Sequence, residues 1–193
     1  MLRTTTTLAV LTFTGSALAN GSAHILLTVD VSDPSAVRIT ATGDVSLLND
    51  SSDTLAAGVT LANLFTTDLQ VSPAIQPLPT GDLSPSGSSG VFDRITNTFG
   101  GLTDRDLNLF STSANGGQDS LMFDTATAAF TGELLADLTG GTFGPIGTTG
   151  DIFVGDTTPP GSGAIIGFYQ IVPSPGSAAM LALAGLAATR RRR

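Results

Sequence analysis

The chain has 193 residues, a formal net charge of −8 and no cysteine. Its basic residues are all arginines, and between the two ends only Arg38, Arg94 and Arg105 face sixteen acidic residues. The part of the chain between the two ends is therefore strongly acidic. It would repel phosphate backbones, so nucleic-acid binding is not expected. The lack of cysteine excludes a disulfide framework, a thiolate metal site and a cysteine nucleophile.

The first segment, residues 1–19, has the layout of a secretory signal peptide. Arg3 gives it a positive start, and a short apolar stretch follows over 8–13. The small residues of the expected cleavage site and the first mature residue are Ala17, Ala19 and Asn20. A permanent membrane helix needs about 20 apolar residues, so we expect this segment to be removed on export.

Residues 20–171 are expected to form one secreted, acidic domain of ordinary size. Short β-prone segments alternate with turn clusters, and apolar and polar residues alternate at period two over 37–42. The expected strands lie within 23–31, 36–42, 58–65, 90–99, 106–111, 120–123, 127–138, 151–154 and 164–172. The pattern predicts an all-β fold, a single β-sandwich or jelly-roll-like domain.

Two parts of this segment have other expected conformations. The region 72–90 contains four prolines and is predicted to be one long loop. One or two helical turns are compatible with the sequences of 51–63 and 133–137.

The last segment, residues 172–193, is a second tripartite signal. Its motif is Val172, Pro173, Ser174, Pro175 and Gly176, and its basic tail is Arg190, Arg191, Arg192 and Arg193. The prolines favour an extended chain. Between motif and tail, the twelve uncharged residues 177–188 span about 18 Å as a helix, which is less than the hydrocarbon core of a bilayer. We expect a short transmembrane helix whose arginines reach the headgroups on the cytoplasmic side.

This order of motif, apolar run and arginine cluster resembles the PEP-CTERM sorting signal of exported bacterial proteins, also labelled the C-terminal domain of ice-binding proteins. In that family the two prolines flank a glutamate, whereas this chain has Ser174. The resemblance implies that Pro173, Ser174 and Pro175 are recognised by an exosortase-like processing enzyme and that the arginine tail stops transfer. It covers only the last 22 residues, so it implies sorting and surface location and nothing about the body.

The sequence carries no motif that points to catalysis or to a cofactor. His24 is the sole histidine and lies on an expected strand, which argues against a Ser-His-Asp triad. Glu133 is the only glutamate, so a glycosidase pair would need an aspartate that spacing does not identify. Phosphate loops, dinucleotide fingerprints and His-rich metal motifs are absent from the sequence, so we expect no enzymatic activity and no cofactor.

Asp104, Asp106 and Asn108 alternate like the first ligands of a calcium loop. Leu109 stands where that loop needs glycine, and Asn115 stands where it needs the closing glutamate. We therefore predict a polar turn that leads into a strand, with a calcium site as the alternative.

Aromatic and threonine residues suggest two further kinds of surface. A sugar platform would use Phe92, Phe99, Phe110 or Tyr169, although strand aromatics usually belong to the core. The Thr-x-Thr pairs 40/42, 96/98 and 125/127 are too isolated for a flat ice-binding array. We interpret them as solvent-facing strand threonines.

The sequence predicts an exported structural or adhesive protein of the bacterial envelope or extracellular polysaccharide matrix. The matrix association, with exopolysaccharide as a possible partner, is what the resemblance implies. The protein is expected to be anchored transiently in the membrane and then to reach the cell surface or the medium. The alternatives are a carbohydrate- or calcium-binding module, a secreted hydrolase and an ice-binding protein. Aromatics and aspartates clustered on one loop edge would favour the module, and acids converging in a cleft would favour the hydrolase.

Export should remove Met1–Ala19, because Ala17 and Ala19 fit the requirement for small residues before the cleavage site. N-terminal sequencing of the exported protein is then expected to begin at Asn20. Recovery of a surface form that retains Met1 would refute this prediction.

Overall fold

A computed structural model of the chain describes residues 24–72, 74–98, 102–112, 119–156 and 163–174. The predicted signal peptide, with Ala17 and Ala19, lies outside these residues, as does Asn20. So do Pro175, Gly176, the predicted transmembrane helix and the tail from Arg190 to Arg193. Among the described residues, no helix is long and apolar enough to cross a membrane.

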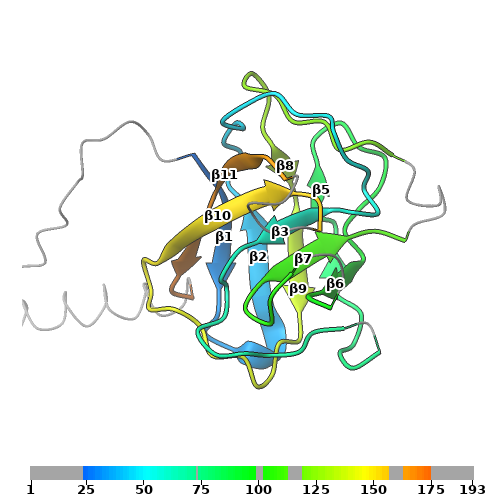
Figure 1. Cartoon of the computed structure of the whole chain (residues 1–193). Helices are drawn as coiled ribbons and strands as arrows, with labels where there is room; N and C mark the ends of the chain where they lie inside the picture. The colour runs from blue at the N-terminus through cyan, green and yellow to red at the C-terminus, as the bar shows by residue number, and fades with distance from the viewer. Residues whose placement is uncertain (1–23, 73, 99–101, 113–118, 157–162, 175–193) are drawn as a thin grey trace, which may run out of the picture.

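The described part of the chain is all-β, as predicted, and its only helical element is the short 3-10 helix η1 (Pro34–Ala36). The strands are β1 (Ile25–Asp30), β2 (Val37–Ala41), β3 (Val59–Leu61), β4 (Thr80–Gly81), β5 (Ser84–Pro85), β6 (Arg94–Thr96), β7 (Leu107–Phe110), β8 (Phe130–Thr131), β9 (Glu133–Ala136), β10 (Thr149–Val154) and β11 (Ile165–Val172). Figure 1 shows their arrangement.

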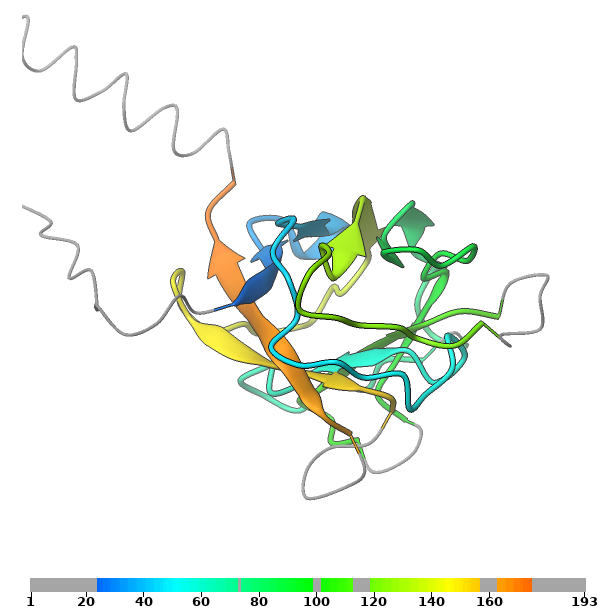
Figure 2. The same ribbon diagram turned by 90° about the horizontal axis from the view of Figure 1, so that it is seen from above.

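Nine of these strands form one mixed sheet in the order β4-β9-β2-β1-β11-β10-β3-β7-β6, and β5 pairs with β8 in a separate ribbon. The first and last strands, β1 and β11, run parallel, and every other pair is antiparallel. The strands are therefore not divided between two sheets of similar size, as a sandwich would require. Instead, the large sheet curls around its own core (Figures 1 and 2).

The two ends of the curled sheet are linked through the residues that follow β4. Leu83 N donates to Glu133 O of β9 at 3.0 Å, and Phe92 N donates to Leu83 O at 2.9 Å. The next residue, Asp93, donates its N–H to Phe110 O of β7 at 3.1 Å. These bonds extend the pairing along β9 and β7 and so connect the two ends of the sheet through the backbone.

Eight of the nine predicted strand segments overlap a strand. The exception is 120–123, which makes only isolated bridges, Thr54↔Ser120 and Asp50↔Phe123. The segment 127–138 is interrupted at Gly132, which has a φ of 82° and lies so close to Asp82 that a side chain there would collide with it. A positive φ and close backbone approach both require glycine.

Two of the other expectations are wrong. Residues 133–137 do not form a helical turn, because 133–136 are strand β9 between β2 and β4. The region 72–90 is not one uninterrupted loop, because it contains the two-residue strands β4 and β5. Both strands are too short to show an alternating pattern, and their pairing depends on distant partners in β9 and β8.

The core lies inside the curl. In β1, β2, β9 and β11 it is formed mainly by alternate residues, whereas β3 and β7 are buried at every position. Leu27 and Val29 of β1, Val37 and Ile39 of β2, and Ile171 of β11 have essentially no exposed surface. Burying each such side chain contributes about 1.5–3 kcal/mol. The outward residues of the same strands are polar at most positions, which explains the alternation in the sequence.

Tyr169 of β11 is the largest fully buried side chain, and its hydroxyl donates to Ala62 O at 2.9 Å. Burial raises the pKa of this phenol well above its usual value, and the nearby acids Asp106 and Asp151 raise it further. Gly150 pairs with Tyr169 across the β10–β11 ladder and leaves room for the ring, since a Cβ there would overlap it.

Gly150→Ala is expected to lower the free energy of unfolding by about 2 kcal/mol, because the added methyl displaces the Tyr169 ring from its site. In a chain of this size the melting temperature should fall by about 6 °C. Gly43→Ala is the control, because nothing lies within 4 Å of a Cβ there and the only cost is its positive φ. An equal or larger loss in the control would contradict the steric explanation.

Candidate functional site

The predicted sorting motif begins within the sheet. Val172 is the last residue of β11 and lies opposite Asp30 in the parallel ladder with β1. Pro173 follows, and Ser174 N donates to Ser32 Oγ at 3.1 Å. Because β1 and β11 are parallel neighbours, their carboxyl ends lie at the same edge of the sheet. This pairing brings Ser32 and Ser174 together.

The corner after β1 is shaped by two aspartates that hold the backbone. Asp30 Oδ1 accepts from Ser32 N at 3.0 Å, which forms a local turn. Asp33 is the N-cap of η1, and its Oδ1 accepts from Ser35 N at 2.9 Å and Ser35 Oγ at 2.7 Å. Pro34 follows at the first position, where a missing N–H costs nothing.

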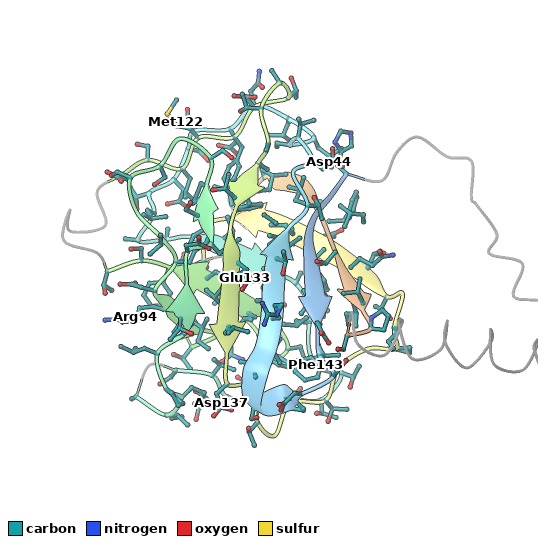
Figure 3. All side chains as sticks on the ribbon, turned by 180° about the vertical axis from the view of Figure 1, so that it is seen from behind. Asp44, Arg94, Met122, Glu133, Asp137 and Phe143 are labelled. Carbon is teal, nitrogen blue, oxygen red and sulfur yellow. The ribbon has the colours of Figure 1, made fainter. Side chains whose placement is uncertain are left out.

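Beside this corner lies an open groove of about 510 Å³. Its lining residues, which are polar except for one alanine, are Asp30, Ser32, Asp33, Ala36, Arg38, Thr40, Glu133 and Ser174. The ladders place Arg38 opposite Asp30 and Thr40 opposite Glu133. The groove therefore runs over neighbouring strands β1, β2 and β9, where Figure 3 labels Glu133.

An ion pair joins the two long side chains of the groove. Arg38 Nη1 lies 2.6 Å from Glu133 Oε2, and both side chains are 43% exposed. At that exposure the pair contributes at most about 1 kcal/mol to stability. It does hold the guanidinium against a carboxylate, so Arg38 is not free to bind an anionic ligand by itself.

The three carboxylates of the groove, on Asp30, Asp33 and Glu133, each accept from a donor of the protein. These contacts hold Asp30 and Asp33 in local turns and Glu133 in an ion pair. The sequence predicted Ser174 as a motif residue but did not identify this groove. Its one sequence signal was the alternation over 37–42, which places Arg38 and Thr40 on the same face.

The residues of the calcium-like pattern have structural roles. Asp106 is buried, and its carboxylate accepts from Asn63 N at 2.9 Å, Thr103 N at 2.8 Å and Thr103 Oγ1 at 3.0 Å. Asn108 is also buried, and its Nδ2 donates to the carbonyls of Ala57 at 2.9 Å and Gly155 at 3.2 Å.

Asp104, by contrast, is exposed. Nowhere in the described part of the chain do three histidine or acidic side chains form a group that would hold a metal ion.

The aromatic candidates for a sugar platform belong to the core. Phe92, Phe110 and Tyr169 are each at most 8% exposed, and Phe99 lies outside the described residues. Thr96 is also buried and donates to Val71 O at 3.3 Å, so the expectation that it faces solvent is wrong. The segment around Val71 covers β6, and alternation within β6 does not reveal this distant contact. His24 precedes β1, and its Nδ1 lies 2.9 Å from Val45 O.

A second hollowed surface surrounds Met122, a residue that is 68% exposed. Hollows of about 320 and 280 Å³ adjoin it, and Asp124 lines both. The backbone N–H groups of Ala126 and Thr127 donate to Asp124 and lower the pKa of its carboxyl group. Figure 3 places Met122 well away from Glu133. No sequence motif marks this surface, because its residues come from separate loops.

Asp53 is an acid in the same group of loops. Partial burial raises the pKa of its carboxyl group, and repulsion from Asp156 and Asp50 adds to that effect, while a hydrogen bond from Thr54 N opposes it. These aspartates come from separate loops but do not form a metal-binding group.

The chain matches no protein-family model, no curated protein and no solved structure. No relative therefore transfers a function to the groove or to the surface around Met122. Function must be inferred from the residues themselves.

If Asp106 is structural, Asp106→Asn should lower the melting temperature by about 5 °C, because an amide nitrogen cannot accept from the Thr103 N–H. This decrease in melting temperature should be the same in millimolar calcium and in EDTA. The unsubstituted protein should also have the same melting temperature in both solutions. The measurement is thermal unfolding by circular dichroism on residues 20–174.

Asp104→Asn removes the same charge at an exposed position and should shift the melting temperature by about 1 °C at most. A bound ion adds about 2.7 kcal/mol at a hundred times its dissociation constant. A rise of several degrees on adding calcium would therefore overturn the structural assignment.

Proposed function

We propose that this protein is exported, sorted to the bacterial cell surface or extracellular polysaccharide matrix, and serves there as a structural or adhesive component. Its N-terminal signal is removed, and an exosortase-like enzyme processes the segment that begins at Val172. The transmembrane helix over 177–188 anchors the protein only until that step. The body is not an enzyme and needs no cofactor.

The observation that carries this proposal is where the core begins and ends. Among the described residues, the first core residue is Leu26, which follows the expected cleavage site, and the last is Ile171, which directly precedes the motif. Cleavage at both signals would therefore leave in place every core side chain of the residues that the structure describes. A body that keeps these buried apolar side chains on processing keeps the main source of its stability.

The charge distribution supports a role outside the cell that does not involve polyanions. Each of the three arginines among the described residues has a carboxylate within 4 Å: Arg38 with Glu133, Arg94 with Asp93 and Arg105 with Asp68. The other thirteen of the sixteen acidic residues have no arginine within 4 Å among the described residues. A body of this charge is repelled by phosphate-rich polymers, and it stays soluble at a surface.

The proposal is tested by the intact mass of the mature protein from its native host. The expected mass begins at Asn20 and lacks the residues after the motif. A mature form that retains the four C-terminal arginines would refute C-terminal processing.

Replacing Arg190–Arg193 with serine should disrupt sorting, because the arginines hold the end of the chain in the cytoplasm. Moving an arginine into the membrane centre costs about 2.5–3.5 kcal/mol on the most lenient scale. We expect unprocessed protein to be released or to stall, measured by cell fractionation and immunoblotting. Replacement with four lysines is the matched control and should preserve sorting. Unchanged retention and processing of the serine variant would contradict this role of the tail.

A further inference from the structure

We propose that the corner of Asp30, Ser32 and Ser174, with the groove beside it, is a docking surface for the processing enzyme. The enzyme would then bind the folded body as well as the motif. This inference rests on the proposed function and goes beyond it, because the resemblance concerns residues 172–193 alone.

The position of Ser174 is the first reason. It belongs to the motif and also lines the groove, and its N–H is held by the Ser32 hydroxyl at 3.1 Å. Ser32 is held in turn by its own N–H, which donates to Asp30 at 3.0 Å. An enzyme that binds the chain at Ser174 therefore also contacts residues that line the groove.

The length of chain between the body and the membrane is the second reason. The predicted transmembrane helix begins at Ser177, three residues after Ser174. Three fully extended residues span at most about 11 Å. A membrane enzyme working in so short an interval cannot reach the motif without contacting the body, and the nearest part of the body is this corner.

The charge of the groove is the third reason, and it indicates which surface fits there. Asp30, Asp33 and Glu133 outnumber Arg38, whose guanidinium is already paired with Glu133. Anionic phospholipid headgroups are repelled by such a groove, so it is not suited to rest on the bilayer. The partner that fits is a protein surface that presents arginine or lysine, and we assign it to the processing enzyme.

Two substitutions test this in the full-length chain, expressed in a host that processes the unsubstituted protein. Ser32→Ala removes the acceptor for Ser174 N–H, and Asp30→Asn removes a charge while keeping an oxygen for Ser32 N–H. Pulse-chase labelling measures conversion of the membrane-bound precursor to the shorter form. Each substitution should slow that conversion by about threefold or more, the effect of losing one hydrogen bond or one charge contact.

The matched controls are Ser52→Ala and Asp104→Asn, which make the same chemical changes at exposed residues that do not line the groove. Ser52 N donates to Asp50 Oδ1 at 2.7 Å, as Ser32 N donates to Asp30. Both should be processed at the normal rate, and all four variants should keep their melting temperatures to within about 2 °C. A separate test leaves the body unsubstituted and uses residues 172–193 fused behind an unrelated exported domain. This fusion lacks the groove and should be processed more slowly than the native chain.

The outcomes separate the two proposals. Normal processing of Ser32→Ala, Asp30→Asn and the fusion would overturn the docking surface and leave the proposed function in place. Equal slowing in the controls would also overturn it, because the effect would not come from the groove. Failure of the unsubstituted chain to be processed in its native host would overturn both.

Discussion

The parallel pairing of β1 with β11 is the interaction on which the rest of the structure depends. In the order of the large sheet, β11 alone joins the strands on the β1 side to those on the β10 side. The sheet therefore has no continuous ladder until the last strand of the chain is in place. Because β1 begins at Ile25 and β11 ends at Val172, the closing contact joins residues from the two ends of the described fold. Such long-range pairing costs loop-closure entropy before its contacts form.

This constraint also explains the place of the candidate site. A parallel pair brings together the carboxyl ends of its strands, so the residues that follow β11 meet those that follow β1. The motif residue Ser174 thus lies against Ser32 rather than at a free end. The same edge carries Asp30 and Asp33, so the motif adjoins an acidic groove. Under the proposed function, sorting and folding would be coupled through this one strand.

Buried polar side chains form hydrogen bonds with backbone groups that are not paired in the sheet. Asp106 and Asn108 bind backbone groups from the segments around Ala57 and Thr103, and the Tyr169 hydroxyl satisfies Ala62 O. Each buried polar group needs such a partner, because desolvation without one is costly. Asp106 and Asn108, two of the three polar residues that resemble metal ligands in the sequence, thus connect irregular segments to the sheet.

The sequence by itself determined the all-β class, most strand positions and the acidic character of the body. It also contains the tripartite signals on which the proposed sorting rests. These features depend on local patterns, namely alternation at period two, turn residues and the order of charged and apolar runs. Only the tertiary structure decided the strand order, the short strands β4 and β5, the burial of Thr96 and the groove beside Ser174. The reason is physical: each depends on contacts between segments far apart in the chain, and alternation at period two identifies the faces of a strand without identifying its neighbour.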